Sequence, residues 1–377
     1  MRVLTIYFCG TSSNQFDAFK ETYWNGELIS TLARNTQGRE FADWIIIDGP
    51  GSGNLQEDEL FTKPGGYYKL SGIARGSGWE ENVKHAAQII KGKFDWQREK
   101  LTAENYKQLQ AAGVPIEDVN ATGCWLWRHY EYGDRQVTPQ LLQEQIIKMF
   151  RKEETLPEQV NLVGWSRGGV SCVMLANLML NDPELKGIHV NIFAVDPVPG
   201  ATNFDSHRVQ LGENVREYVA MYARDERSTG FMCVIPNTDV STKVSIYPMA
   251  GRHATLVGNA AANGAKGTKV LFEPGDIVRH YAEVCLTRWG VSLDKMLSLT
   301  APQLDQRLAT IKKSYNVYTV MRSTTYTARV YSEIDGERKV HFNGDAKFSS
   351  VSGPRFSPEK GLSVGHIPDS SYFNDIV

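Results

Sequence analysis

Ser166 is the residue whose setting in this sequence points most directly to chemistry. It lies in Gly164-Trp165-Ser166-Arg167-Gly168, with an apolar segment at 160–163 before it and a longer one at 170–180 after it. This order of strand, Gly-x-Ser-x-Gly and helix is typical of a nucleophile elbow, whose tight turn exposes the serine hydroxyl for attack on a carbonyl carbon. Both glycines fit, because side chains there would collide with neighbouring backbone. We therefore expect Ser166 to be a nucleophile; the alternative is an ordinary turn with a solvated serine.

A serine nucleophile needs a base to take its proton and an acid to orient that base. In α/β-hydrolases the acid and then the histidine follow the serine along the chain. A predicted strand at 188–195 ends at Asp196, at the carboxyl edge where open parallel sheets hold their active sites. His253 follows a strand end near Tyr247, in a glycine-flanked loop that can bring an imidazole back to the serine.

We therefore expect Asp196 to be the orienting acid and His253 the base. For Asp196 the alternative is a turn or helix-cap aspartate ahead of Pro197. For His253 the alternative is a structural histidine, and His207 and His280 are the next candidates for the base.

Strand-like and helix-like patterns alternate as far as residue 290, which predicts an α/β fold: a mostly parallel, α/β-hydrolase-like sheet with helices on both faces. The predicted strands cover 3–8, 44–47, 160–163 and 188–195, and the predicted helices 80–90, 138–150 and 170–180. We expect one catalytic domain over residues 1–300, with an aromatic-rich insertion at about 91–135 that could cover the site.

The remaining residues, 301–377, are expected to form a helix, a small β appendage and a tail. Tyr318 and Val320 flank Thr319, and apolar and polar residues alternate again at 326–330. The pair Asp335-Gly336 offers a hairpin turn before 339–342.

Composition narrows the classes of function. A net charge of −2 gives no electrostatic case for a nucleic-acid partner or for an anionic membrane surface. The five cysteines are widely spread, without a Cys-x-x-Cys pair or a histidine at metal-ligand spacing, so we expect reduced thiols and no metal. The first residues read as a strand and not as a signal peptide, and no apolar run reaches the ~18 residues of a membrane span.

Five short motifs, in order, resemble the uncharacterised α/β-hydrolase domain family whose members include type VI secretion phospholipase effectors. The motifs are Gly10-Thr11-Ser12-Ser13-Asn14, the elbow with its second glycine at Gly169, Asp196 to Gly200, Ala223 to Arg227, and the loop from Gly251 through His253 to Gly258. The resemblance covers residues 1–290. The shared order of the motifs, more than any single motif, makes this resemblance specific.

This resemblance implies Ser166, Asp196 and His253 as the triad, and no cofactor. It also implies that the loop at Gly10 and Thr11 lies beside the elbow, so that its backbone amide joins that of Arg167 in an oxyanion hole. The chain departs from the family at Cys9, where members have aspartate, and after His253, where they have a second glycine-rich run.

The implied activity is that of a serine esterase or lipase acting on a lipid ester, above all a phospholipid, with transient contact to a membrane surface. The implied biology is a bacterial effector made in the cytoplasm without a signal peptide and delivered into a target cell. Its partners would be a secretion-system component or an immunity protein.

Two alternatives belong to other classes. The departure at Cys9 leaves open a catalytically inactive hydrolase fold that serves as a binding module. Glycine-rich runs at 45–53 and 72–78 suggest a nucleotide-binding α/β protein, although neither completes a phosphate-binding motif. Asp48 and Asp225 are conceivable metal ligands but read equally well as turn and surface charges. For Arg227 the alternatives are a pair with Asp225 or Glu226 and a contact with a substrate phosphate, and we expect it at the surface.

Overall fold

Six parallel strands form one sheet, in the spatial order β2-β1-β5-β6-β7-β9. The computed structural model describes residues 2–51, 78–92, 120–122, 129–131, 156–200, 203–327, 329–330, 336–342, 362 and 369–376. The strands of the sheet are β1 Val3–Phe8, β2 Trp44–Ile47, β5 Gln159–Trp165, β6 His189–Val195, β7 Val215–Ala223 and β9 Lys243–Met249. Each neighbouring pair in it runs parallel. The predicted α/β architecture is confirmed, and it is consistent with an α/β-hydrolase-like sheet.

The strand order reverses at β1. One side of β1 pairs with β2, and the other side pairs with β5, beyond which the later strands follow. Loops at the carboxyl ends of two strands that flank such a reversal diverge and leave a crevice between them. Gly10 follows β1 and Ser166 follows β5, so the sheet brings the first and second sequence motifs to one crevice.

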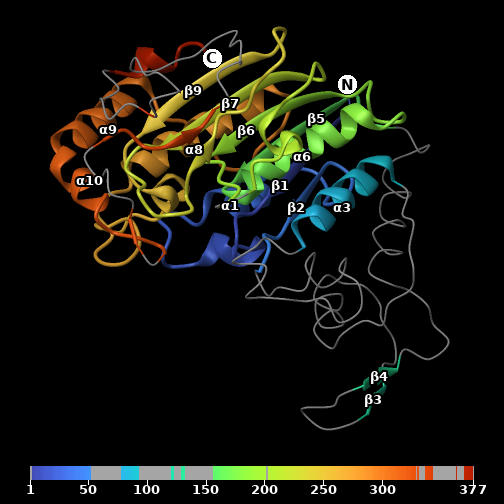
Figure 1. The fold of residues 1–377 in the computed structure, drawn as a ribbon, viewed down its shortest axis with the longest axis horizontal. Coiled ribbons are helices and arrows are strands. Elements are labelled where there is room, and N and C mark those ends of the chain that lie inside the picture. Colours follow the sequence, from blue (N-terminus) through green and yellow to red (C-terminus); the bar gives the residue numbers. More distant parts are fainter. Residues whose placement is uncertain are drawn as a thin grey trace.

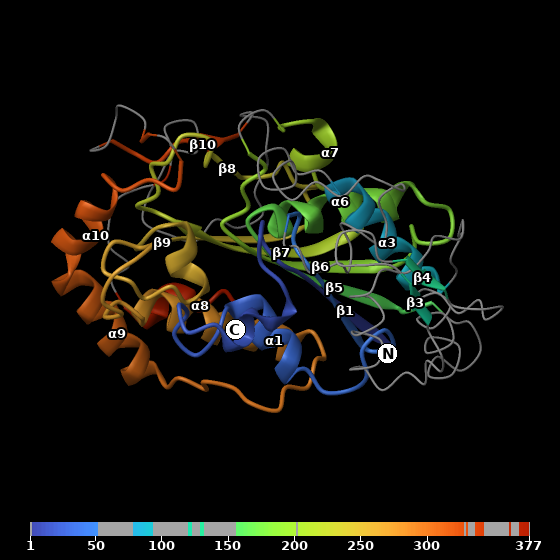
Figure 2. The same ribbon diagram turned by 90° about the horizontal axis from the view of Figure 1, so that it is seen from below.

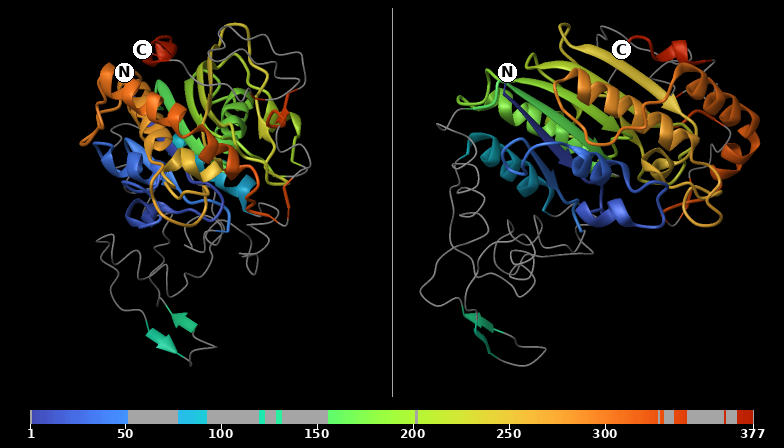
Figure 3. Two further views of the ribbon diagram at one scale, coloured as in Figure 1. Left: turned by 90° about the vertical axis from the view of Figure 1, so that its left-hand side faces the viewer. Right: turned by 180° about the vertical axis from the view of Figure 1, so that it is seen from behind.

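Helices cover both faces of the sheet (Figure 1, Figure 2). On one face lie α3 Trp79–Lys91, α6 Arg167–Asn181 and the short α7 Ser206–Val209. On the other lie α1 Leu28–Asn35 and α8 Glu273–Arg288, followed by α9 Ala301–Lys313 (Figure 3). Side chains of β1 alternate between the two layers: Ile6 belongs to the core under α3 and α6, and Tyr7 to the core under α1 and α8. This two-sided burial explains why the strands read as continuous apolar runs.

The predicted strands and the helices at 80–90 and 170–180 are confirmed to within two residues at most ends. The helix predicted at 138–150 lies outside the described residues. So does most of the predicted insertion, of which β3 Asn120–Thr122 and β4 His129–Glu131 are described as an antiparallel pair. Within the described part of the chain, no helix is both long and apolar enough to cross a membrane.

The C-terminal part corrects one prediction. Residues 315–321 form the helix α10 Tyr315–Met321, and not the predicted strand around Thr319. Tyr318 and Met321 are fully buried and lie three residues apart on one helix face, whereas Val320 is 68% exposed. A stretch this short fits either period, and burial of the (i, i+3) pair selects the helix.

The predicted hairpin is also revised. Within the described residues, the strand β10 Val340–His341 pairs in parallel with β8 Cys233–Val234, so its partner is a distant segment and not residues 326–330. The turn residue Asp335 lies outside the described residues. Near the end of the chain, η4 Ser370–Phe373 packs Phe373 against the rings of Tyr247 and Tyr281.

Candidate active site

The turn between β5 and α6 has the geometry of a nucleophile elbow. Ser166 has φ +58° and ψ −125°, a strained conformation for a residue with a side chain, and its amide donates to the Val195 carbonyl at 3.0 Å. A Cβ at Gly164 would overlap the backbone of Gly168, and a Cβ at Gly168 would overlap the Phe8 carbonyl. The two glycines are therefore required by the close approach of three backbone segments, as the sequence predicted.

Asp196 and His253 meet across the end of the sheet. Asp196 directly follows β6 and is fully buried, with φ +43°. His253 opens the short helix η3 His253–Val257, and its Nδ1 lies 2.5 Å from Asp196 Oδ2. A carboxylate at Nδ1 holds the proton there, which leaves Nε2 as the nitrogen able to accept a proton from another group.

The Asp196 carboxylate has further donors besides the imidazole. The Ala223 amide donates to Oδ1 at 3.0 Å, and both terminal nitrogens of the Arg338 guanidinium contact the two carboxylate oxygens. Burial acts to raise the pKa of Asp196, but the Arg338 charge and the His253 hydrogen bond outweigh it and hold that pKa below its usual value. Asp196 is therefore an ionised, fully paired carboxylate at neutral pH.

Ser166 and His253 line one cavity, with a volume of about 680 Å³. That size is within the range of small-molecule sites. The wall also carries aromatic rings and two cations: Tyr23, Trp165, Phe231, Tyr326, Arg167 and Lys266. The Phe231 ring meets the His253 ring edge-on at 5.0 Å between centroids, and the Trp165 ring lies 5.2 Å away.

The residues predicted for an oxyanion hole lie beside the elbow. Arg167 is the first residue of α6, so its amide is one of the four at a helix start that have no acceptor within the helix. Its side chain donates to Thr11 Oγ1 at 3.0 Å, and both Thr11 and Arg167 line the cavity. Gly10 packs against the Trp165 ring so closely that a Cβ there would overlap it. Burial lowers the pKa of Arg167 to about 10.

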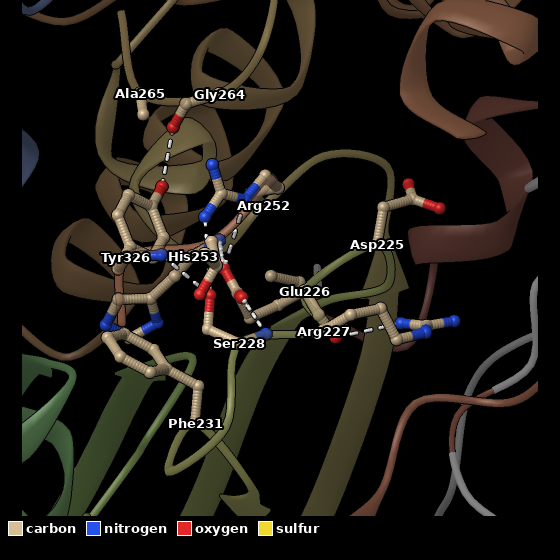
Figure 4. Close-up of polar contacts among 12 residues, drawn as sticks. Asp225, Glu226, Arg227, Ser228, Phe231, Arg252, His253, Gly264, Ala265 and Tyr326 are labelled. Atoms are coloured by element: carbon tan, nitrogen blue, oxygen red, sulfur yellow. Dashed lines mark hydrogen bonds and ion pairs between the residues drawn. The ribbon is translucent and has the colours of Figure 1, made fainter. Parts of the chain in front are cut away.

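Glu226 fixes the loop that carries His253, a role that the sequence reading missed (Figure 4). Its Oε2 accepts from the His253 amide at 3.3 Å and lies 3.5 Å from Arg252 Nε. Its Oε1 accepts from the Ser228 amide at 2.6 Å. The Arg252 guanidinium in turn stacks on the Tyr326 ring at 3.8 Å. A buried ion pair thus ties the turn after β7 to the histidine loop.

The charged residues around Glu226 correct the expectation that Arg227 lies at the surface. Asp225, Glu226 and Arg227 are all almost completely buried. Arg322 donates to Asp225 at 2.9 Å, and Arg227 donates to three backbone carbonyls, that of Gly336 at 2.7 Å. Charges can be buried when each is paired in this way. A signal was present in the sequence: four charged residues follow directly on the apolar strand, at the edge that the C-terminal segments cover.

The other candidate histidines lie elsewhere. His207 is on the surface, 3.3 Å from Glu80. His280 lies in α8, where it accepts from the Leu299 amide at 3.2 Å and where burial lowers its pKa to about 4. Neither lines the cavity with Ser166. His253 is the candidate base that the fold brings to the elbow.

Two further sequence features have structural roles. Cys9 is a buried thiol in the core under α1 and α8. In the run at 45–53, a Cβ at Gly49 would overlap the Gly10 carbonyl, and Asp48 Oδ1 accepts from the Gln15 amide at 2.9 Å. The described part of this run therefore serves to bring two loops together.

No protein-family model matches this chain, and no curated protein matches it. Among solved structures, the chain is similar to an uncharacterised protein from Pseudomonas aeruginosa, with a TM-score of 0.46 and 16% identity over 84% of this chain and 52% of that one. It is also similar, more weakly, to the Tle1 effector in a structure bound to the VgrG spike of the type 6 secretion system, with a TM-score of 0.31 and 12% identity over 68% of this chain and 50% of that one. The chain spans about half the length of each.

Proposed function

We propose that this protein is a serine hydrolase that cleaves a carboxylic ester, with Ser166 as nucleophile, His253 as base and Asp196 as orienting acid. The observation that carries the proposal is the hydrogen bond that His253 Nδ1 donates to Asp196, beside the cavity that His253 and the strained Ser166 both line. Strained backbone conformations of this kind cluster at functional sites.

The proposed reaction proceeds through an acyl-enzyme. His253 Nε2 takes the proton of the Ser166 hydroxyl as its oxygen attacks the ester carbonyl carbon. Backbone amides of Arg167 and of the Gly10-Thr11 loop stabilise the oxyanion, and the alcohol leaves with the proton from His253. Water then attacks the acyl-enzyme by the same route in reverse, which releases the acid and restores Ser166.

The proposed substrate is a lipid ester, above all a phospholipid, met at a membrane surface. The ordered motifs that resemble the phospholipase effectors support this class, as do the aromatic rings on the cavity wall, which offer apolar contact to an acyl chain. Arg167 and Lys266 on the same wall supply positive charge suited to a phosphate group.

Release of fatty acid from mixed phospholipid vesicles tests the substrate class. We expect wild-type protein to release fatty acid and Ser166→Ala to release none. A short 4-nitrophenyl ester should likewise be hydrolysed by the wild type and not by Ser166→Ala, because the same proposed triad would act on both substrates. Hydrolysis of the short ester without any release from vesicles would contradict the phospholipid substrate and leave the esterase intact.

The motif resemblance also leads us to propose delivery as a bacterial effector, together with a secretion-system component or an immunity protein. Growth of a bacterial host that expresses the protein in its periplasm is a direct test. We expect growth inhibition by the wild type and none by Ser166→Ala, and equal growth of the two would count against a toxic effector.

A further inference from the structure

We propose that Arg338, from the C-terminal part of the chain, is a positioning residue of this site, which holds Asp196 in register with His253 and offsets part of the negative charge that Asp196 presents to the imidazole. The inference rests on the proposed serine hydrolase. No sequence motif pointed to Arg338, which lies 142 residues beyond its partner.

The Arg338 guanidinium is anchored through both of its terminal nitrogens. It is 1% exposed. Nη2 lies 3.0 Å from Asp196 Oδ2, Nη1 contacts Oδ1, and the same two nitrogens donate to the carbonyls of Ala223 at 2.6 Å and Phe231 at 2.9 Å. A planar guanidinium can make this fork of four bonds, whereas a lysine ammonium cannot reproduce it. Arg338 therefore joins the end of β6, the end of β7 and the loop of Phe231.

The segment that carries Arg338 is itself fastened to the body of the protein. β10 pairs with β8, and the Ile235 amide donates to the His341 carbonyl at 3.1 Å. On the other side, the Gly336 carbonyl accepts from Arg227, whose own position after β7 is fixed by the backbone. Phe231, whose carbonyl Arg338 holds, also packs its ring edge-on against His253. A displacement of Arg338 would thus disturb the imidazole both through Asp196 and through Phe231.

The charge of Arg338 acts on the same carboxylate that supports His253. The Asp196 carboxylate attracts positive charge at the imidazole, and a guanidinium in bidentate contact with Asp196 weakens that attraction. The other charged or titratable groups around the imidazole come from several elements. They are Glu226 after β7, Arg252 in the same loop, Tyr326 after α10, and Arg167 and Lys266 on the cavity wall. Glu226 and Arg252 pair with each other, so Arg338 is the cation whose removal most directly changes the charge at Asp196.

The test compares Arg338→Met and Arg338→Lys with wild type in the pH dependence of labelling by a fluorophosphonate, which needs no substrate. We expect Arg338→Met to move the acidic limb of the labelling rate to higher pH, by about one pH unit, because the imidazolium loses an opposing charge. Arg338→Lys keeps the charge but not the fork. It should leave the limb in place and lower the plateau rate roughly tenfold through misalignment.

Arg288→Met is the matched control. Arg288 also makes a bidentate pair with a carboxylate of β7, to Glu217 at 2.8 and 2.7 Å, but at the opposite end of that strand. We expect its acidic limb to coincide with that of wild type. Rates are expressed per folded protein, so that loss of stability alone moves neither the limb nor the plateau.

The outcomes separate the two proposals. Labelled wild type together with an Arg338→Met limb equal to that of wild type would overturn the role of Arg338 and leave the hydrolase standing. A limb shift of equal size in Arg338→Lys would also overturn it, since the charge is retained there. A folded wild type that is not labelled at any pH would remove the hydrolase and this inference together. If Arg338→Met does not fold, Arg338→Gln takes its place with the same expected shift.

Discussion

At the scale of single residues, two members of the proposed triad have a strained backbone. Ser166 and Asp196 both have positive φ, at +58° and +43°. Such a backbone costs on the order of 1–3 kcal/mol for each non-glycine residue and persists where its surroundings fix it. The two residues follow neighbouring strands in which Trp165 pairs with Val195. The sheet register therefore places both strained turns side by side.

Gly168 gives a test of this turn. A Cβ there would overlap the Phe8 carbonyl and come within 2.6 Å of the Cys9 carbonyl, so Gly168→Ala must displace backbone. We expect it to lower the free energy of unfolding by about 3 kcal/mol and to abolish labelling of Ser166. Gly187→Ala is the control, because nothing lies within 4 Å of a Cβ at that position.

Urea unfolding of the two glycine variants measures the difference. Equal stabilities for Gly168→Ala and Gly187→Ala would contradict the tight elbow.

Asp196 predicts a pH dependence of stability with a definite sign. Its pKa in the folded protein lies below the ordinary value of 3.8, so its stabilisation is present above that pH and is lost as the pH falls through the folded pKa. Asp196→Asn removes it and leaves Arg338 buried without its counter-charge, which costs about 3 kcal/mol at pH 7. Below about pH 4 the difference in the free energy of unfolding between wild type and variant should shrink.

Unfolding of both proteins in urea at pH 7 and pH 3 measures that difference. A difference that widens toward pH 3 would contradict the ionised, paired Asp196.

At the scale of elements, short-range sequence patterns predicted the strands and helices whose signals are local. The apolar runs of β1 and β6 and the residues flanking Ser166 fix strand, turn and helix locally, and their predicted bounds are nearly those observed. The prediction failed at α10, where alternation over a few residues also fits a helix face. Arg338 and Glu226 could not be found, because each is recognised by a partner that only the folded chain brings close.

Glu226 tests the link between the turn after β7 and the histidine loop. Glu226→Ala removes the acceptor of the His253 amide and leaves Arg252 buried without its counter-charge. We expect a loss of about 3 kcal/mol in the free energy of unfolding and at least a roughly tenfold slower labelling of Ser166.

Asp205→Ala is the matched control for Glu226→Ala. Asp205 also pairs with an arginine, Arg208, but its side chain is 64% exposed, so its loss should cost less than about 1 kcal/mol and leave labelling unchanged. Comparable effects of the two substitutions would count against the buried pair as the support of the loop.

At the scale of the whole molecule, the site collects residues from distant parts of the chain. The reversal of strand order at β1 brings the Gly10 loop and Ser166 to one crevice, and the ends of β6 and β9 bring Asp196 and His253 beside it. The C-terminal part closes the arrangement through Arg338 and Tyr326. The order of motifs in the sequence was enough to propose Ser166, Asp196 and His253 as one site, since parallel strands end at one edge. It could not predict what packs over that edge.

The most direct test of the account is the position of a fluorophosphonate adduct, mapped by mass spectrometry of peptides from wild type, Ser166→Ala and His253→Ala. The proposed triad predicts one adduct on Ser166 in the wild type and none in either variant, with all three proteins folded as judged by circular dichroism. An adduct on another serine of the cavity, such as Ser12, or labelling of Ser166 that persists in His253→Ala, would contradict it.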